Sequence, residues 1–277
     1  MRLGYNTNGF PQHQLSDVVT ILAELDYQAV AITPDVLQLD PFDGRSLERA
    51  TALGRQCRDL GLAIAVETGA RFVLEARRKH QPTLLSAPEG AGRRLDMLRR
   101  CLDLAQALEA ETFSFWSGRF GDDSPEPSRE VLLDRLCAGT EALLDAAGGS
   151  THVCFEPEPG MLVASMAELD EFLGRLARDD LGIMLDVGHV PVTEPISAEA
   201  VIRQVGPRLG GLQLDDCPGG RHDHAFPGEG DLDWPAVVAA IQETGFGGLA
   251  CLELPRHAHD PVQTATRARA FFRELGV

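Results

Sequence analysis

The sequence predicts a single (β/α)8 barrel of the α/β class that spans residues 1–277. Short apolar runs alternate with amphipathic segments eight times, and the runs are apolar enough to need helices on both faces. A length of 277 residues suits one barrel of ~250 residues without a second domain. A doubly wound open sheet is the alternative fold, but no Gly-x-Gly-x-x-Gly motif follows any apolar run.

The first half of the chain supplies four predicted units of strand and helix. Val18, Val19 and Leu22 fall on one side of the first helix, as an amphipathic helix requires. Ser46 suits the N-cap of the second helix, and Gly61 suits its end. The strands are expected at 3–6, 29–33, 63–67 and 112–116, and the helices at 16–25, 46–60, 92–108 and 129–147.

The second half of the chain repeats this alternation. A loop rich in Gly, Pro and Asp precedes it and extends through Pro127. The apolar run that ends at Asp186 is typical of a buried strand, because turn residues bound it on both sides. The strands are expected at 152–156, 181–186, 209–214 and 249–253, and the helices at 165–177, 198–205, 234–244 and 261–275.

Composition limits the class of partner. The formal net charge of −17 disfavours binding to the phosphate backbone of nucleic acids. The six cysteines form no Cys-x-x-Cys pair, and Cys154 and Cys251 fall inside apolar runs as small core residues. Neither a signal peptide nor an apolar run of membrane-spanning length is evident. We therefore expect a soluble, cytoplasmic protein with a small-molecule partner and no membrane partner.

Four oxygen-bearing side chains end consecutive predicted strands: Glu156, Asp186, Gln213 and Glu253. In a barrel the carboxyl ends of the strands open on one face, so these side chains can converge on one point. Three carboxylates there would raise one another's pKa, and a divalent cation would remove that repulsion. All-oxygen donors suit Mg²⁺ or Mn²⁺. The alternative interpretation is that each residue separately caps a helix or lies in a solvated loop.

The same segments resemble the xylose isomerase-like TIM barrel superfamily of sugar isomerases and epimerases, which also includes endonuclease IV. The resemblance lies in residues 155–156, 185–189, 227–234 and 252–253. Glu156, Asp186 and Glu253 match the metal-binding set of ketose 3-epimerases, in which a histidine stands at the position of Gln213. The segment from Gln213 to His222 is similar to that of hydroxypyruvate isomerases, where a Gln supplies an oxygen ligand. The resemblance implies one divalent cation, Mn²⁺ or Mg²⁺, with Zn²⁺ or Co²⁺ as alternatives.

The resemblance also implies a metal-dependent isomerase or epimerase that moves a proton next to a carbonyl through an ene-diolate. Glu156 and Glu253 would act as acid and base on opposite faces of the substrate, and His189 would contact the substrate or Glu156. The alternative for His189 is a histidine that only caps its loop. A lyase of the 3-dehydroshikimate or inosose dehydratase type would begin with the same proton abstraction. A non-catalytic metabolite-binding barrel is a third hypothesis, although the presence of both glutamates disfavours it.

An endonuclease-IV-like activity is disfavoured by the negative charge and by the residues at the strand ends. Glu67, Trp116 and Gln213 stand where a three-zinc site would need histidines. Barrels of this kind often pair through their helices, so a homo-oligomer is compatible with the sequence.

Six further residues are candidates for substrate binding. Glu67 and Trp116 end the third and fourth predicted strands, and Arg71 opens a long basic connection over residues 68–88 that would form a lid. A polar loop after the seventh strand supplies cationic or ring nitrogens that would bind a carboxylate or phosphate. For the residues of the two connections a solvated loop or helix face is the alternative, and for Trp116 the alternative is a side chain that only plugs the barrel. The six candidates are Glu67, Arg71, Trp116, Arg221, His222 and His224.

Overall fold

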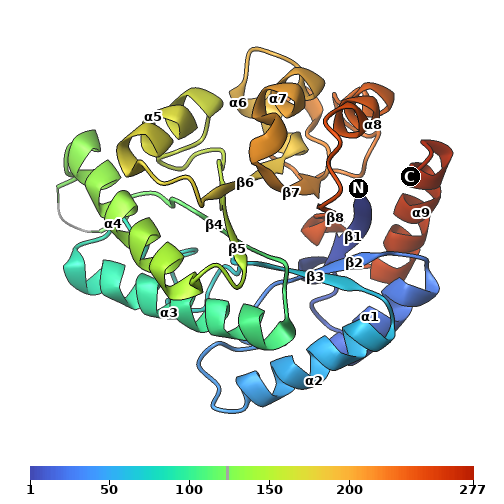
Figure 1. Ribbon diagram of the computed structural model, residues 1–277, viewed down its shortest axis with the longest axis horizontal. Coiled ribbons are helices and arrows are strands. Elements are labelled where there is room, and N and C mark those ends of the chain that lie inside the picture. The colour runs from blue at the N-terminus through green and yellow to red at the C-terminus, as the bar shows by residue number, and fades with distance from the viewer. Residues whose placement is uncertain (123–124) are drawn as a thin grey trace.

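Eight parallel strands close into a barrel in the order β1 to β8 in the computed structural model, with helices around the outside (Figure 1). The structure describes residues 1–122 and 125–277, so part of the predicted loop before Pro127 lies outside the described residues. The barrel confirms the fold class predicted from the alternating pattern. The strands are β1 Arg2–Asn6, β2 Ala29–Ile32, β3 Ala63–Glu67, β4 Thr112–Trp116, β5 His152–Glu156, β6 Gly182–Asp186, β7 Leu209–Leu214 and β8 Leu249–Leu252.

The helices cover the outer face of the barrel and bury their apolar sides against the strands. Among the predicted elements, only the start of α3 differs from the prediction by more than one residue. Helix α3 begins at Pro88 rather than at residue 92, because a proline lacks the N–H that the first turn of a helix leaves unpaired. Strand β8 ends at Leu252, so Glu253 lies just beyond it. The helices are α1 Leu15–Glu24, α2 Ser46–Asp59, α3 Pro88–Leu108, α4 Arg129–Ala147, α5 Met166–Leu176, α6 Val190–Thr193, α7 Ala198–Val205, α8 Trp234–Glu243 and α9 Pro261–Glu274.

Small side chains fill one side of the barrel interior. Ala29, Ala31, Ala65 and Cys251 pack together with Leu249 there. A Cβ atom added to Gly4 would lie 2.5 Å from the Cys251 sulfur, so β1 and β8 approach too closely for a larger residue. Dense packing of this kind makes the interior a core and leaves the chemistry to the carboxyl ends of the strands.

All six cysteines are buried and free, which confirms that Cys154 and Cys251 are core residues. Among the described residues, no helix combines the length and the apolar character that crossing a membrane requires.

Candidate active site

Strand register brings the predicted oxygen donors to one end of the barrel. Asp186 pairs with Gln213 across β6 and β7, and Glu156 pairs with Trp116 across β4 and β5. Glu253 follows β8, where its backbone N–H donates to the Leu214 carbonyl at 3.1 Å. Asp186, Gln213 and Glu156 are 1%, 2% and 6% exposed. Asp186, Gln213 and Glu156 therefore belong to one buried polar layer, whereas Glu253 is only partly buried.

Two of these donors have oxygens without a partner. Asp186 accepts the Gly188 N–H at 2.8 Å through Oδ1, but its Oδ2 has no hydrogen bond among the described residues. The Gln213 Oε1 atom is also buried and has no hydrogen-bond partner among the described residues. A buried acceptor without a donor costs ~1–3 kcal/mol, so such atoms usually await a ligand, an ion or a water. Hard oxygen donors of this kind fit a divalent cation.

Carboxylates and imidazoles group closely around Asp186. Within the described residues, three sets of possible ligand atoms lie within 4.8 Å of one another: Glu156, Asp186 and His189; Glu158, His189 and His222; and Asp186, Asp215 and His224. Glu253 belongs to none of these sets. The arrangement offers more donors than the predicted quartet, and most of the additional ones are imidazoles.

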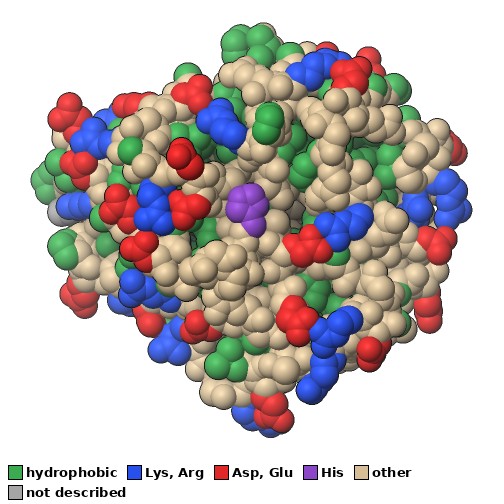
Figure 2. Space-filling model, in the orientation of Figure 1, with side chains coloured by type: hydrophobic (Ala, Val, Ile, Leu, Met, Phe, Trp, Pro, Cys, Tyr) green, Lys and Arg blue, Asp and Glu red, His purple; other side chains and the backbone are tan. Residues whose placement is uncertain are grey.

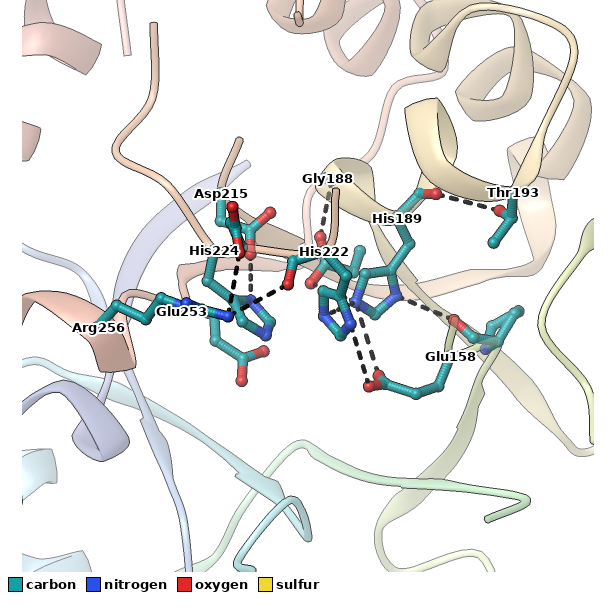
Figure 3. Close-up of polar contacts among 12 residues, drawn as sticks. Glu158, Gly188, His189, Thr193, Asp215, His222, His224, Glu253 and Arg256 are labelled. Carbon is teal, nitrogen blue, oxygen red and sulfur yellow. Dashed lines mark hydrogen bonds and ion pairs between the residues drawn. The ribbon is translucent and has the colours of Figure 1, made fainter. Parts of the chain in front are cut away.

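The pKa values of the glutamates reflect their burial. Burial, followed by repulsion from Glu158, raises the pKa of Glu156 well above its usual range. Burial also raises the pKa of Glu158 to about 7 and that of Glu253 to about 8. The Asn8 amide donates to Glu253 Oε1 at 2.9 Å, which fixes the orientation of this carboxyl. In Figure 3 the side chains of Glu158 and Glu253 enter the barrel mouth from different sides.

His189 lies at the centre of the cluster (Figure 3). The Pro157 carbonyl can only accept, so His189 Nδ1 carries the hydrogen of their 3.0 Å bond. Burial lowers the pKa of His189, which favours the neutral ring with a lone pair on Nε2. That nitrogen lies 3.3 Å from Asp186 Oδ2 and 3.1 Å from His222 Nε2. The Nε2 atom of His189 therefore faces both Asp186 and His222.

The loop between β7 and α8 brings two of its predicted residues to the site. The His222 ring lies 4.6 Å from that of His189, and His224 Nδ1 contacts the buried Asp215. Arg221 behaves differently, because its side chain is 73% exposed and pairs with Asp223 at 3.3 Å. The structure therefore leaves Arg221 at the surface.

The predicted residues on the other side of the mouth have protein contacts of their own. Both oxygens of Glu67 accept hydrogen bonds, from Thr33 Oγ1 and from the Gly69 N–H. The Trp116 ring stacks on His80 at 4.8 Å, which makes it part of the wall. Arg71 is exposed and lines a cavity of about 260 Å³ beside Glu253. Figure 2 shows a histidine in a hollow at the centre of the face, bordered by acidic and basic side chains.

Sequence reasoning missed Glu158 and Asp215. Glu158 follows Glu156 by two positions, and Asp215 follows Gln213 by two. Since side chains two apart in an extended segment point to the same face, this spacing was a usable signal.

A family model described as xylose isomerase-like TIM barrel matches residues 19–275. The chain belongs to the xylose isomerase-like TIM barrel family. Solved structures with this fold share little sequence with the chain. A crystal structure of D-psicose 3-epimerase from Clostridium cellulolyticum H10 superimposes with a TM-score of 0.76 at 15% identity, over 99% of each chain. The probable 3-DHS dehydratase of Bacillus anthracis gives the same TM-score at 14% identity, over 99% of each chain.

Sequence relatives in the family match over a shorter stretch. The uncharacterised protein y4fM of Sinorhizobium fredii is 35% identical over 161 residues, which are 55% of this chain and 50% of that protein. A D-psicose 3-epimerase of Ruminiclostridium cellulolyticum is 24% identical over 168 residues, which are 57% of this chain and 53% of that protein. The chain thus spans about half the length of the curated relatives it matches.

Proposed function

We propose that this chain is a divalent-metal-dependent isomerase or epimerase of a small sugar or hydroxy-carbonyl compound. The observation that carries the proposal is the pair Glu156 and Glu253, whose pKa values burial raises at one barrel mouth. A raised pKa lets a carboxyl hold a proton that it can return, and the value of about 8 for Glu253 suits both taking and returning one. The likeness to a D-psicose 3-epimerase, in sequence and in fold, supports the same reaction class.

The residues that would hold the cation are Glu156, Asp186, Gln213 and Glu253. The partnerless oxygens of Asp186 and Gln213 support this assignment, because a cation would satisfy both. A bound cation would polarise the substrate carbonyl and stabilise the negative charge of the ene-diolate. Mn²⁺ or Mg²⁺ suits these oxygen donors best, with Zn²⁺ or Co²⁺ as alternatives.

The side chains of Glu156 and Glu253 carry out the proton transfer. One of Glu156 and Glu253 removes the proton from the carbon beside the carbonyl, and the other returns a proton to the opposite face or to the neighbouring carbon. Asn8 holds Glu253 in place for this step. The cavity beside Glu253 is lined by Asn8, Thr33 and Arg71, which offer hydrogen bonds to substrate hydroxyl groups.

A metal-dependent lyase is the second candidate, and the likeness in fold to the probable 3-DHS dehydratase favours it. That reaction would also begin with removal of a proton by one glutamate. It would then lose water instead of returning the proton. A non-catalytic metabolite-binding barrel is the third hypothesis, and such a protein would need neither Glu156 nor Glu253 for proton transfer.

The first experiment measures metal content and thermal stability in the wild type and in Glu253→Gln, with the exposed Glu274→Gln as control. We expect about one Mn²⁺ or Mg²⁺ per chain at these oxygens and a rise in Tm with that metal, both reduced only in Glu253→Gln. Metal-loaded protein is then incubated with a panel of ketoses and hydroxy-acids in deuterated water and followed by NMR. Deuterium at the carbon beside the carbonyl supports the isomerase, and an unsaturated product supports the lyase. If the protein binds no metal and catalyses no deuterium exchange, the isomerase and the lyase proposals are both overturned, and the non-catalytic binding barrel is favoured.

A further inference from the structure

The connection between β3 and α3 brings two cations, Arg71 and Lys79, together at the barrel mouth. The backbone N–H of His80 donates to the Arg71 carbonyl at 2.7 Å, so the loop closes on itself. Lys79 immediately precedes His80 in the chain. Arg71 also lines the cavity of about 260 Å³ that Glu253 lines. The closed loop therefore places Lys79 next to a cation that already belongs to the proposed substrate cavity.

Buried contacts fasten this loop to the barrel. Arg94 of α3 is 4% exposed, and its Nε donates to the Pro82 carbonyl at 2.8 Å. The ring of His80 stacks on Trp116 at the end of β4, with the two ring centroids 4.8 Å apart. The backbone around Lys79 is therefore held in place by protein contacts on its C-terminal side.

The two cations have no carboxylate partner. Within residues 1–122 and 125–277, neither Arg71 nor Lys79 forms an ion pair, although the chain is strongly acidic and other exposed arginines do, as Arg175 does with Asp134 at 2.6 Å. Partial burial lowers the pKa of Lys79, and repulsion from Arg71 adds to this effect. Two cations that repel each other are stabilised by an anion bound to both.

His80 adds a hydrogen-bond donor that the protein does not use. Burial, followed by repulsion from Lys79, lowers the pKa of His80 to about 3, which favours the neutral ring with one N–H. Both ring nitrogens are shielded from solvent, and neither has a hydrogen-bond partner among the described residues. A buried N–H without an acceptor is costly, so a ligand oxygen would be a favourable partner for it.

The remainder of the mouth is acidic and would repel an anionic ligand. Glu156, Glu158 and Glu253 lie there with Asp186. Burial raises the pKa of Glu158 to about 7, and the charge of Lys79 is among those that oppose this rise, so the ammonium group acts across the mouth. A cavity with one acidic end and one cationic side suits a substrate whose negative group lies away from its reacting carbon.

We propose that Arg71, Lys79 and His80 bind an anionic group of the substrate, a phosphate or a carboxylate, while its hydroxy-carbonyl end reaches Glu253. This assignment rests on the proposed isomerase or epimerase function and names an anionic sugar derivative as its substrate. The guanidinium group supplies a planar fork of N–H donors and the ammonium group a point charge, and both bind phosphate and carboxylate oxygens well. Neutral ketoses would lack this contact and bind more weakly.

Glycerol, D-glycerate and sn-glycerol 3-phosphate test this site, because they share a polyol and differ in charge. In calorimetric titrations of the purified wild type, at least one anionic probe should bind about tenfold more tightly than glycerol. Arg71→Gln and Lys79→Gln should lose that preference, and Lys79→Arg should keep it. Arg55→Gln is the control, because Arg55 is exposed on α2. The tighter of the two anionic probes distinguishes a phosphate from a carboxylate.

Lys79 also gives a local readout, because it is the only lysine of the chain. Reductive methylation with isotope-labelled formaldehyde labels Lys79 and the N-terminal amine and keeps their charge. The methyl signal that is absent from Lys79→Gln belongs to Lys79. In the wild type this NMR signal should shift on addition of the tighter anionic probe and stay in place with glycerol.

Equal affinity for glycerol and both anionic probes, or no binding of either anion, would overturn the anion site. A preference that persists in both Arg71→Gln and Lys79→Gln, or a Lys79 signal that no probe shifts, would also overturn it. These readouts need no turnover, so they are separate from the metal content and deuterium exchange that test the proposed function. A chain without metal or exchange that still shows the Lys79-dependent preference would lose the enzyme proposal and keep the anion site.

Discussion

The Asp216 carboxylate accepts the indole N–H of Trp234 at 2.9 Å, and this contact joins the end of β7 to the start of α8. The same carboxylate accepts the backbone N–H groups of Gly228 at 3.0 Å and Leu232 at 3.2 Å. Asp216 is fully buried. One side chain therefore holds both ends of the loop over residues 217–233, which carries the two histidines of the site.

Replacing Asp216 with Asn should destabilise the fold by about 2–4 kcal/mol, because an amide cannot accept all of these donors and buried donors would lose their partners. Chemical denaturation followed by circular dichroism measures the change. Asp260→Asn is the control, since Asp260 is exposed and its side chain makes no cap hydrogen bond to α9. A change in the free energy of unfolding below ~0.5 kcal/mol for Asp216→Asn would show that the loop does not depend on this carboxylate.

Gly188→Ala should disrupt the site from within. A Cβ atom at this position would overlap Asp215 Oδ1 and lie 3.3 Å from Asp186 Oδ1. Both carboxylates are buried, so they have no room to move aside without breaking the contact between Asp215 and His224. We expect at least a tenfold loss of metal affinity, measured by calorimetric titration.

The matched control for this change is Gly174→Ala in helix α5. No atom lies within 4 Å of a Cβ added there. Alanine in a helix is more favourable than glycine, so this variant should gain about 0.5–1 kcal/mol of stability and keep its metal affinity. Equal metal affinity in Gly188→Ala and Gly174→Ala would mean that Asp186 and Asp215 play no part in binding.

Metal-free protein should lose stability as the pH rises from about 4.5 to about 8. Burial raises the pKa of Glu253 to about 8, so the folded state holds a proton that the unfolded state releases near pH 4.5. The associated stability is complete below the unfolded pKa and is lost as the pH passes the folded pKa. Thermal unfolding in a chelator, at a series of pH values, measures this dependence.

Glu253→Gln should show a flatter profile of Tm against pH, because the glutamine does not titrate. Adding the divalent metal to the wild type should also flatten the profile, since the ion favours the ionised carboxylates. Identical profiles for the wild type and Glu253→Gln without metal would contradict the raised pKa of this group.

The sequence was informative about the barrel because each strand is a short apolar run between turn residues, and all eight strands end within one residue of the expected position. The site was predictable only in part. Strand ends identify Glu156 and Asp186, but the path of the β7–α8 loop decides that His222 turns inward and Arg221 outward. That path depends on the bonds of Asp216, which connect residues far apart in the chain.

Asn8 is expected to act as a positioning residue for Glu253 in the proposed reaction. Its amide is 2.9 Å from Glu253 Oε1, and the loss of a hydrogen bond to a charged group costs ~1.5–3 kcal/mol. Asn8→Ala should therefore lower kcat about 10- to 100-fold on any substrate that the deuterium-exchange screen identifies. Because the amide stabilises the ionised carboxyl, its removal should also shift to higher pH the limb of the activity profile that reports Glu253. Asn8→Asp should shift that profile further, since a second carboxylate beside Glu253 would oppose its ionisation. A lower kcat with an unchanged pH profile in both variants would assign Asn8 to the general shape of the mouth and leave the orientation of Glu253 to the strand alone.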